Sequence, residues 1–224
     1  MKKLFTTLML LVMIVANAQE IQKPDYNSIE QNIHDSASKY YYPKLFGRYK
    51  KADTTLTLEE ARHLYYGSAY IQAPVSTEEA VEALQKLNGI LAKSAPTQAD
   101  CLTALEYTDV ILAYEPFSLT VKQYRMACYR QLGRYDEAIL ERTQCEIIAD
   151  AILSSGDGTT KDRSIHVLDT DNEMEVLSLM GFKPAAGDYA VTGNHDYITL
   201  QDNAYRRPGV YFYINNAPVA VSGL

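Results

Sequence analysis

Residues 124–138, YRMACYRQLGRYDEA, decide the fold of the central part of the chain. Gly133 is typical of the point where one helix ends, because glycine accepts the left-handed backbone conformation of helix C-termini. The small residues Ala127 and Cys128 let two helices approach closely, and the neighbouring tyrosines fill the groove between them. The stretch therefore predicts an antiparallel hairpin of two helices, over 118–132 and 135–153.

This hairpin resembles the tetratricopeptide repeat, whose first helix ends in Leu-Gly and whose second helix begins with Tyr. Residues 132–133 and Tyr135 carry the resemblance, and residues 78–116 form a weaker copy. Lys122 stands where the repeat usually has Trp, and Arg142 stands at the aromatic position of the second helix. Because about three repeats are normally needed for a stable solenoid, we expect a stack of hairpins rather than a full array.

Capping signals and prolines place the remaining helices. Residues 57–60 (TLEE) and 76–79 (STEE) are capping boxes, in which the first hydroxyl accepts the N3 amide proton. Pro74, Pro96 and Pro116 fall in the breaks, where a missing N–H does no harm. The short links indicate antiparallel hairpins stacked side by side. The predicted helices are 57–72, 77–93, 98–114, 118–132 and 135–153.

Beyond residue 154 the pattern changes to short β-forming runs. Residues 163–169, 188–191, 195–200 and 209–215 read as strands, and 170–181 as a short helix with Asn172 as a possible cap. The predicted fold class is α+β: tetratricopeptide-like hairpins followed by a small antiparallel sheet whose apolar face packs on the helices. The predicted division of the chain is a signal peptide (1–18), an N-terminal segment packing on the helices (19–56), a helical region (57–155) and a β-rich region (156–224).

The first 18 residues have the three parts of a secretory signal peptide. Lys2 and Lys3 precede an uncharged apolar stretch, and Ala16-Asn17-Ala18 is a small-x-small cleavage signature. We expect cleavage after Ala18 and a soluble bacterial protein in the periplasm or medium. The cut removes two lysines and no acid, so the net charge of −7 becomes −9 over the 206 remaining residues. An acidic surface argues against nucleic-acid partners, and no later stretch is long enough to span a membrane.

Three segments resemble an uncharacterised family of exported bacterial proteins of about this size, known only as a domain of unknown function. They are residues 40–67 (YYYPKLFGRYKKADTTLTLEEARHLYYG), 149–169 (ADAILSSGDGTTKDRSIHVLD) and 209–214 (GVYFYI). The resemblance implies the fold and the export, and it brings no activity with it.

One candidate ligand site lies on the predicted helix 57–72. Arg62, Tyr66 and Tyr70 recur at four-residue intervals along its edge, and a guanidinium flanked by two phenols suits a carboxylate or a sugar. The alternative is that Glu59 pairs with Arg62 while the tyrosines cover a neighbouring helix. His63 is expected toward solvent.

A second candidate follows from the tetratricopeptide pattern. If the hairpin uses its groove, Gln123, Arg130 and Gln131 would line it and bind a peptide or another envelope protein. The sequence has no nucleophile elbow, no zinc-protease motif and no phosphate-binding loop. It indicates no cofactor and no metal. We therefore favour a non-enzymatic binding module.

The alternative function is a hydrolase or metal-dependent enzyme that uses His166, His195 and nearby acids such as Asp196. Residues 169–173 (DTDNE) lack the later glycine and glutamate of a calcium loop. This hypothesis requires the side chains to converge in one pocket.

The cysteines are Cys101, Cys128 and Cys145, an odd number without a C-x-x-C motif. A disulfide between Cys128 and Cys145 is one alternative. Two buried free thiols are the favoured one.

Overall fold

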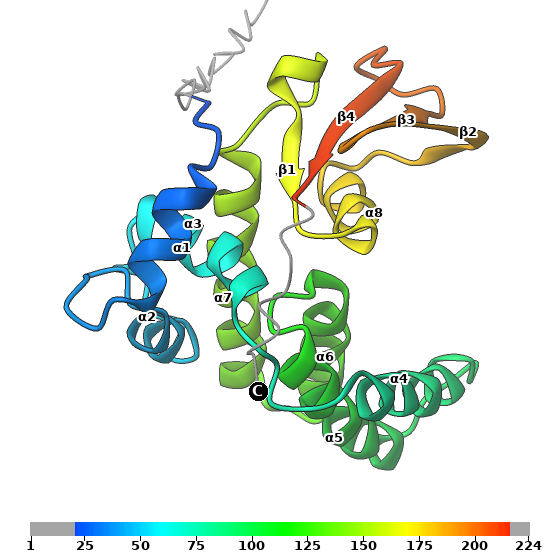
Figure 1. Ribbon diagram of the computed structural model, residues 1–224. Coiled ribbons are helices and arrows are strands. Elements are labelled where there is room, and N and C mark those ends of the chain that lie inside the picture. Colours follow the sequence, from blue (N-terminus) through cyan, green and yellow to red (C-terminus); the bar gives the residue numbers. More distant parts are fainter. Residues whose placement is uncertain (1–20, 216–224) are drawn as a thin grey trace, which may run out of the picture.

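The computed structural model describes residues 21–215, apart from the side chains of 188 and 189, and the predicted signal peptide lies outside this range. Within it the chain forms helices and then mainly strands (Figure 1), which confirms the α+β class. The helices are α1 (Tyr26–His34), α2 (Tyr42–Tyr49), α3 (Leu58–Gly67), α4 (Thr77–Leu91), α5 (Gln98–Tyr114), α6 (Leu119–Gln131), α7 (Tyr135–Leu153) and α8 (Thr170–Leu179), with short 3₁₀ turns η1 (Ser68–Tyr70) and η2 (Lys161–Arg163). The strands are β1 (Ile165–Val167), β2 (Pro184–Thr192), β3 (His195–Leu200) and β4 (Gly209–Ile214).

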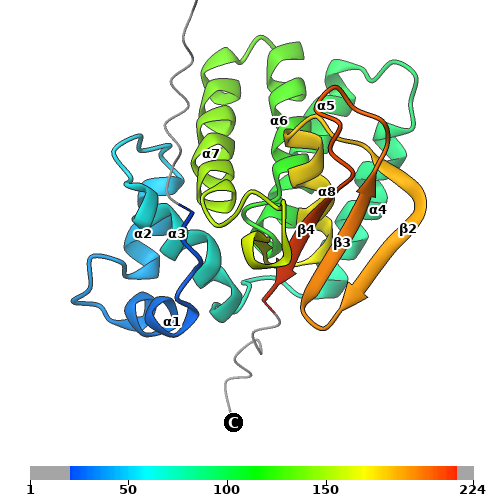
Figure 2. The same cartoon turned by 90° about the horizontal axis from the view of Figure 1, so that it is seen from above.

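The helices α4 to α7 pack in chain order, each against the next, as the hairpin prediction requires. Gly133 has a φ of 73° and ends α6 in the left-handed conformation expected for it. The stacking prediction is wrong for α3, which packs on α7 and not beside α4. Figures 1 and 2 show α1–α3 on one side of α7 and α4–α6 on the other, so the link 71–76 crosses from one side to the other.

Helix α3 is covered on several sides. It packs against α1 and α2 as well as α7, and seven consecutive residues, 61–67, are buried. Two helices of the N-terminal segment therefore pack on α3. These two helices are α1 and α2, and the sequence patterns predict no helix before residue 57.

The sheet is mixed, with the strand order β1-β4-β3-β2. The pairs β2–β3 and β3–β4 are antiparallel, whereas β1 and β4 are parallel, so the prediction of an antiparallel sheet is wrong for this one pairing. Parallel neighbours need a crossover connection. Here the chain passes through α8 and the β2–β3 hairpin on its way from β1 to β4. Alternation along a strand predicts which side chains share a face, but not which strand lies next to it.

The sheet packs its apolar face inward, as predicted. Val210 and Phe212 of β4 are fully buried and belong to the main hydrophobic cluster, with residues from α1–α3, α7, α8 and β1. A separate small cluster joins α4, α5 and α6. Helix α8 is capped by Asp169 and not by Asn172, because the Asp169 side chain accepts the Asn172 amide proton.

The turn after α7 ties the helical part to the sheet. The Gly158 amide donates to the Arg163 carbonyl (2.7 Å), and the Gly158 carbonyl accepts from the Tyr211 amide (2.9 Å). The GDG stretch, residues 156–158, thus connects the end of α7 to β4.

The N-cap of α3 provides a first prediction. The Thr57 side chain accepts from the Glu60 amide (3.2 Å), and the Glu60 carboxylate accepts from the Thr57 amide (2.8 Å). Thr57→Ala should lower the free energy of unfolding by about 1 kcal/mol, because an N-cap is lost. Thr57→Ser keeps the hydroxyl and should change the free energy of unfolding by only a few tenths of a kcal/mol. Urea unfolding measures both, and equal losses would contradict a role for the hydroxyl.

Candidate binding cleft

A cleft of about 1240 Å³ lies between the N-terminal helices and the helical hairpins. One wall comes from α2, α3 and the link 71–76, and the other from α5, α6 and α7, with the start of α8 at one end. Aromatic side chains form much of its surface. They are Tyr42, Phe46, Tyr49, Tyr65, Tyr114 and Phe117.

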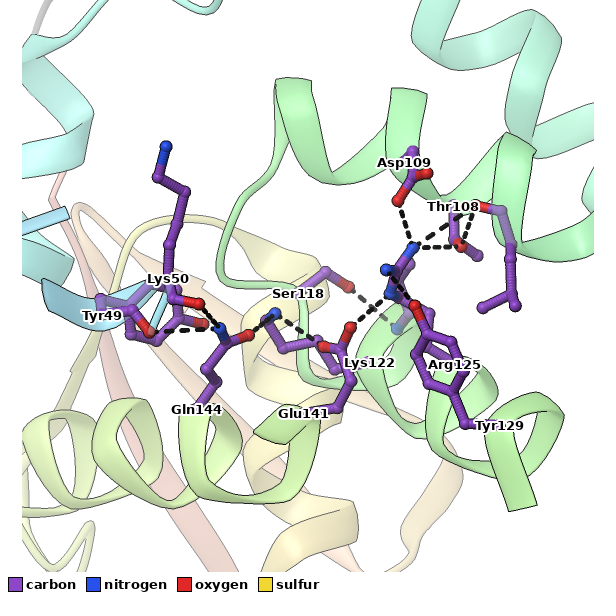
Figure 3. Close-up of polar contacts among 12 residues, drawn as sticks. Tyr49, Lys50, Thr108, Asp109, Ser118, Lys122, Arg125, Tyr129, Glu141 and Gln144 are labelled. Carbon is purple, nitrogen blue, oxygen red and sulfur yellow. Dashed lines mark hydrogen bonds and ion pairs between the residues drawn. The ribbon is translucent and has the colours of Figure 1, made fainter. Parts of the chain in front are cut away.

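A buried polar network forms part of the wall on α6 and α7 (Figure 3). The Glu141 carboxylate accepts from Lys122 Nζ (3.0 Å) and from Arg125 Nε (2.5 Å). Arg125 Nη1 also donates to Thr108 Oγ1 (2.9 Å) and pairs with Asp109 (2.5 Å). A buried charge is tolerated only when it is paired and hydrogen-bonded, and this network meets that condition.

The network extends across the cleft to α2. Gln144 Oε1 accepts from Lys122 Nζ (2.6 Å), and Gln144 Nε2 donates to the carbonyl oxygens of Tyr49 and Lys50 (3.1 Å each). The Lys122 ammonium also lies 5.4 Å from the centre of the Tyr49 ring. Burial lowers the pKa of Lys122, and the Glu141 carboxylate acts against that shift. These contacts fix α2 against the second hairpin.

Acidic side chains gather at the end of the cleft near α8. We call Glu115, Asp169 and Asp171 the acidic rim, since all three line the cleft. Partial burial, followed by repulsion from Asp169, Asp171 and Glu175, raises the pKa of Glu115 to about 7. Glu175 lies behind the rim and accepts from Ser118 Oγ and the Thr120 amide (2.8 Å each). The rim therefore carries crowded negative charge.

The tetratricopeptide-derived candidates lie elsewhere. Gln123, Arg130 and Gln131 are exposed on α6 and are not among the residues that line this cleft. Gln131 faces α5, where its Nε2 donates to the Pro96 carbonyl (2.7 Å) and its Oε1 accepts from Cys101 Sγ (3.2 Å). The structure does not bring the three together in the cleft.

Arg62, Tyr66 and Tyr70 do lie close together, around Tyr26 of α1. All three influence the pKa of Tyr26, which burial raises far above its ordinary value. Arg62 donates to Ser154 Oγ (2.8 Å) and the Gln22 carbonyl (2.5 Å), and its Nε lies 3.3 Å from a Glu59 oxygen. Tyr66 is fully buried and donates to the His166 carbonyl (3.2 Å). Ligand binding by this group stays a prediction, and it would require these buried side chains to become accessible.

His63 is buried, so the expectation that it faces solvent is wrong. Its ring stacks on Tyr40 with 3.7 Å between ring centres, and its Nδ1 lies 2.9 Å from the Glu59 carbonyl oxygen. Arg62 and His63 are both buried for the same reason. Helix α3 has neighbours on more than one side, and polar residues away from its apolar face meet partners from the N-terminal segment.

His166 and His195 share one face of the sheet, with Tyr213 between them. His166 of β1 and His195 of β3 lie on either side of Tyr213 of β4, and each is its partner in the sheet register. The centre of the Tyr213 ring lies 4.6 Å from that of His166 and 5.0 Å from that of His195. His166 Nδ1 is 2.9 Å from the Tyr26 hydroxyl, and burial lowers the pKa of His166 to about 4. Asp196 follows His195 directly, so it faces the opposite, buried side of the sheet. The residues of the enzymatic hypothesis are therefore split between two faces.

Sequence reasoning missed Lys122, Arg125, Glu141 and Gln144 as cleft residues. The signal was present, because Lys122 replaces an aromatic residue of the repeat that the hairpin resembles. Residues 122 and 125 are three apart on one helix, as are 141 and 144 on the next, so each pair shares a helix face. Two facing polar stripes inside a predicted hairpin indicate a buried network.

The three cysteines are free thiols. Cys128 lies beside Cys101, whose hydrogen bond and charge add to the effect of burial in raising the pKa of Cys128 to about 12. Burial also raises the pKa of Cys145 to about 12. The favoured alternative of free thiols agrees with this arrangement, although Cys128 and Cys145 are only half-buried.

These features define an α+β protein with a repeat-like helical region and a large cleft of mixed aromatic and charged lining. Among residues 21–215, we find no helix with the length and apolarity needed to cross a membrane, and no cluster of three or more metal-ligating side chains. The chain belongs to the family described as "Domain of unknown function (DUF4919)", whose model matches residues 27–219. No curated protein and no solved structure gave a significant match.

Proposed function

We propose that this chain is an exported, non-enzymatic binding module of the bacterial envelope, and that it binds a segment of a protein or peptide in the cleft. The observation that carries the proposal is the cleft itself. Its volume of about 1240 Å³ is above the roughly 300–1,000 Å³ of ordinary small-molecule sites. A segment of polymer fits such a space better than a small metabolite does.

The export part of the proposal rests on the signal-peptide pattern of residues 1–18. Expression in a bacterial host followed by mass measurement of the secreted or periplasmic chain tests it. The expected mature protein begins at Gln19, and a chain that keeps residues 1–18 in the cytoplasm would refute it.

Filling the cleft should abolish binding. Ala113 lies on α5 and lines the cleft, so Ala113→Trp places an indole in the space that a ligand would occupy. Ala73→Trp does the same from the opposite wall. Short random peptides displayed on phage and selected on the mature wild-type protein supply the probe. The selected peptides should lose most of their binding to both variants.

The matched control is Ala99→Trp, at an exposed position near the start of the same helix and outside the cleft. It should bind the selected peptides as the wild type does, and urea unfolding should show all three variants folded. No enrichment above bare support, or equal binding by the cleft variants and the control, would refute the proposal.

A further inference from the structure

The charges around the cleft are unbalanced. Among the described lining residues there are six carboxylates and three cationic side chains, and the cationic side chains are Lys50, Lys122 and Arg125. Lys122 and Arg125 are already paired with Glu141, and Arg125 also with Asp109. The excess negative charge therefore lies elsewhere on the lining, and chiefly at the acidic rim.

Among the described residues, the rim carboxylates have no cationic partner of their own. Within residues 21–215, the ion pairs closer than 4.0 Å that involve cleft residues use Glu141 and Asp109 and none of the three rim residues. The charged neighbours that act on Glu115 are all carboxylates. A cation placed at the rim would relieve this repulsion, because an opposite charge within a few ångströms favours the ionised form.

A second, independent observation points to a ligand in the same cleft. Tyr49 lines it and is only 2% exposed, yet its hydroxyl has no hydrogen-bond partner among the described residues. Buried hydroxyls usually have a partner, and leaving one unpaired is energetically unfavourable. Burial raises the pKa of Tyr49, so the group stays protonated and can donate. Less than 1 Å² of the hydroxyl oxygen is accessible to solvent, so a carbonyl oxygen of a peptide backbone would accept from it only once a neighbouring side chain has moved aside.

The aromatic wall already accommodates ammonium groups. Lys50 Nζ lies 5.2 Å from the Phe46 ring centre, and Lys122 Nζ lies at a similar distance from Tyr49. Aromatic faces attract cations, and more strongly when water is excluded. The lining thus combines carboxylates, aromatic faces and a buried donor.

We infer that the cleft recognises an extended segment bearing lysine or arginine side chains, whose cations bind at the acidic rim while its backbone meets the Tyr49 side of the cleft. This inference rests on the proposed function and specifies its ligand. Complementary charge distinguishes such a segment from an acidic or a purely apolar one.

The test uses the mature protein and a fluorescently labelled peptide of alternating lysine and alanine, with the glutamate–alanine peptide for comparison. The wild type should bind the lysine peptide saturably and the glutamate peptide not measurably. The double variant Glu115→Gln/Asp171→Asn removes two rim charges and leaves the Asp169 cap of α8 in place. It should bind the lysine peptide about tenfold more weakly, since each of the two lost charges contributes a few-fold in affinity.

The control is Glu106→Gln/Asp136→Asn, which removes the same two charge types from exposed positions of α5 and the first turn of α7, outside the cleft. It should change the affinity less than about twofold, because the net charge alone acts weakly at physiological salt. Equal losses in the two double variants would mean that binding follows overall charge, and would overturn the inference.

The affinity should also depend on pH in a defined direction. Glu115, with its pKa near 7, is largely protonated at about pH 6 and ionised at about pH 8, while lysine stays charged. Its charged neighbours are Asp171 and Glu175 of α8 and Asp169, the N-cap of that helix. Binding should therefore tighten as pH rises across this range, and Glu115→Gln should weaken that dependence.

The possible failures are distinct from those of the proposed function. Selected phage peptides that are neutral or acidic, but lose binding to Ala113→Trp, would leave the binding module standing and overturn the cationic ligand. Displacement of the lysine peptide by spermine at equal concentration would assign the rim to small polycations and also overturn it. If the lysine peptide does not bind at all, the inference of a cationic ligand is also overturned.

Discussion

Glu141→Ala should lower the free energy of unfolding by about 3–5 kcal/mol, because it leaves buried Lys122 without a carboxylate and Arg125 with Asp109 alone. Lys122 and Arg125 are 4% and 9% exposed, and both donate to Glu141. Urea unfolding followed by circular dichroism gives the difference directly.

An exposed ion pair provides the control for this result. Lys86 and Glu82 lie 2.7 Å apart on the surface of α4, so Lys86→Ala should cost less than about 0.5 kcal/mol. The double variant Lys122→Met/Glu141→Ala should lose less than the sum of its two single variants, because one unpaired buried charge is removed with its partner. A Glu141→Ala loss as small as that of Lys86→Ala would show that the network is not needed for folding.

Gly156→Ala should be the second severe substitution, with a loss of about 3 kcal/mol typical of overpacking against a part of the chain that cannot yield. An added methyl group would overlap the Ser164 carbonyl oxygen and lie 2.5 Å from that of Arg163. Both are backbone atoms next to β1, so relief requires the turn to move away from the sheet.

Gly89→Ala is the matched control, since a methyl group at that position in α4 meets nothing within 4 Å. It should stabilise the protein by about 0.5–1 kcal/mol, because alanine is the better helix former. Thermal and urea unfolding should agree on opposite signs for the two variants. A neutral effect of Gly156→Ala would mean that the close approach of residues 156 and 164 is not required.

The sequence predicted the helices well because their signals are local. Capping boxes, breaks at prolines and Gly133 are each read within a few residues, and α4 to α7 begin within one residue of their predicted starts. The neighbours of α3 were not predictable in this way. Its partners α1 and α7 are far away in the sequence, and the two-sided burial of Arg62 and His63 follows from them.

The candidate sites also combine features that local sequence signals predict with features that depend on distant parts of the chain. The pairing of His166 and His195 with one tyrosine depends on the parallel neighbour β4, which alternation alone does not specify. The cleft depends on where α2 and the link 71–76 come to lie relative to α6. The tetratricopeptide analogy indicated Gln123, Arg130 and Gln131, which are exposed on α6, whereas Lys122 and Arg125 of the same helix line the cleft.

Two hydrophobic clusters meet at the cleft. Tyr42 and Tyr49 belong to the cluster that includes the sheet, whereas Leu112 packs against the one shared by α4, α5 and α6. Each cluster forms a potential unit of cooperative unfolding. A ligand that contacts residues of both clusters would therefore couple these units, so that local opening of the α4–α5 hairpin becomes rarer in the complex and the protein gains rigidity far from the bound atoms.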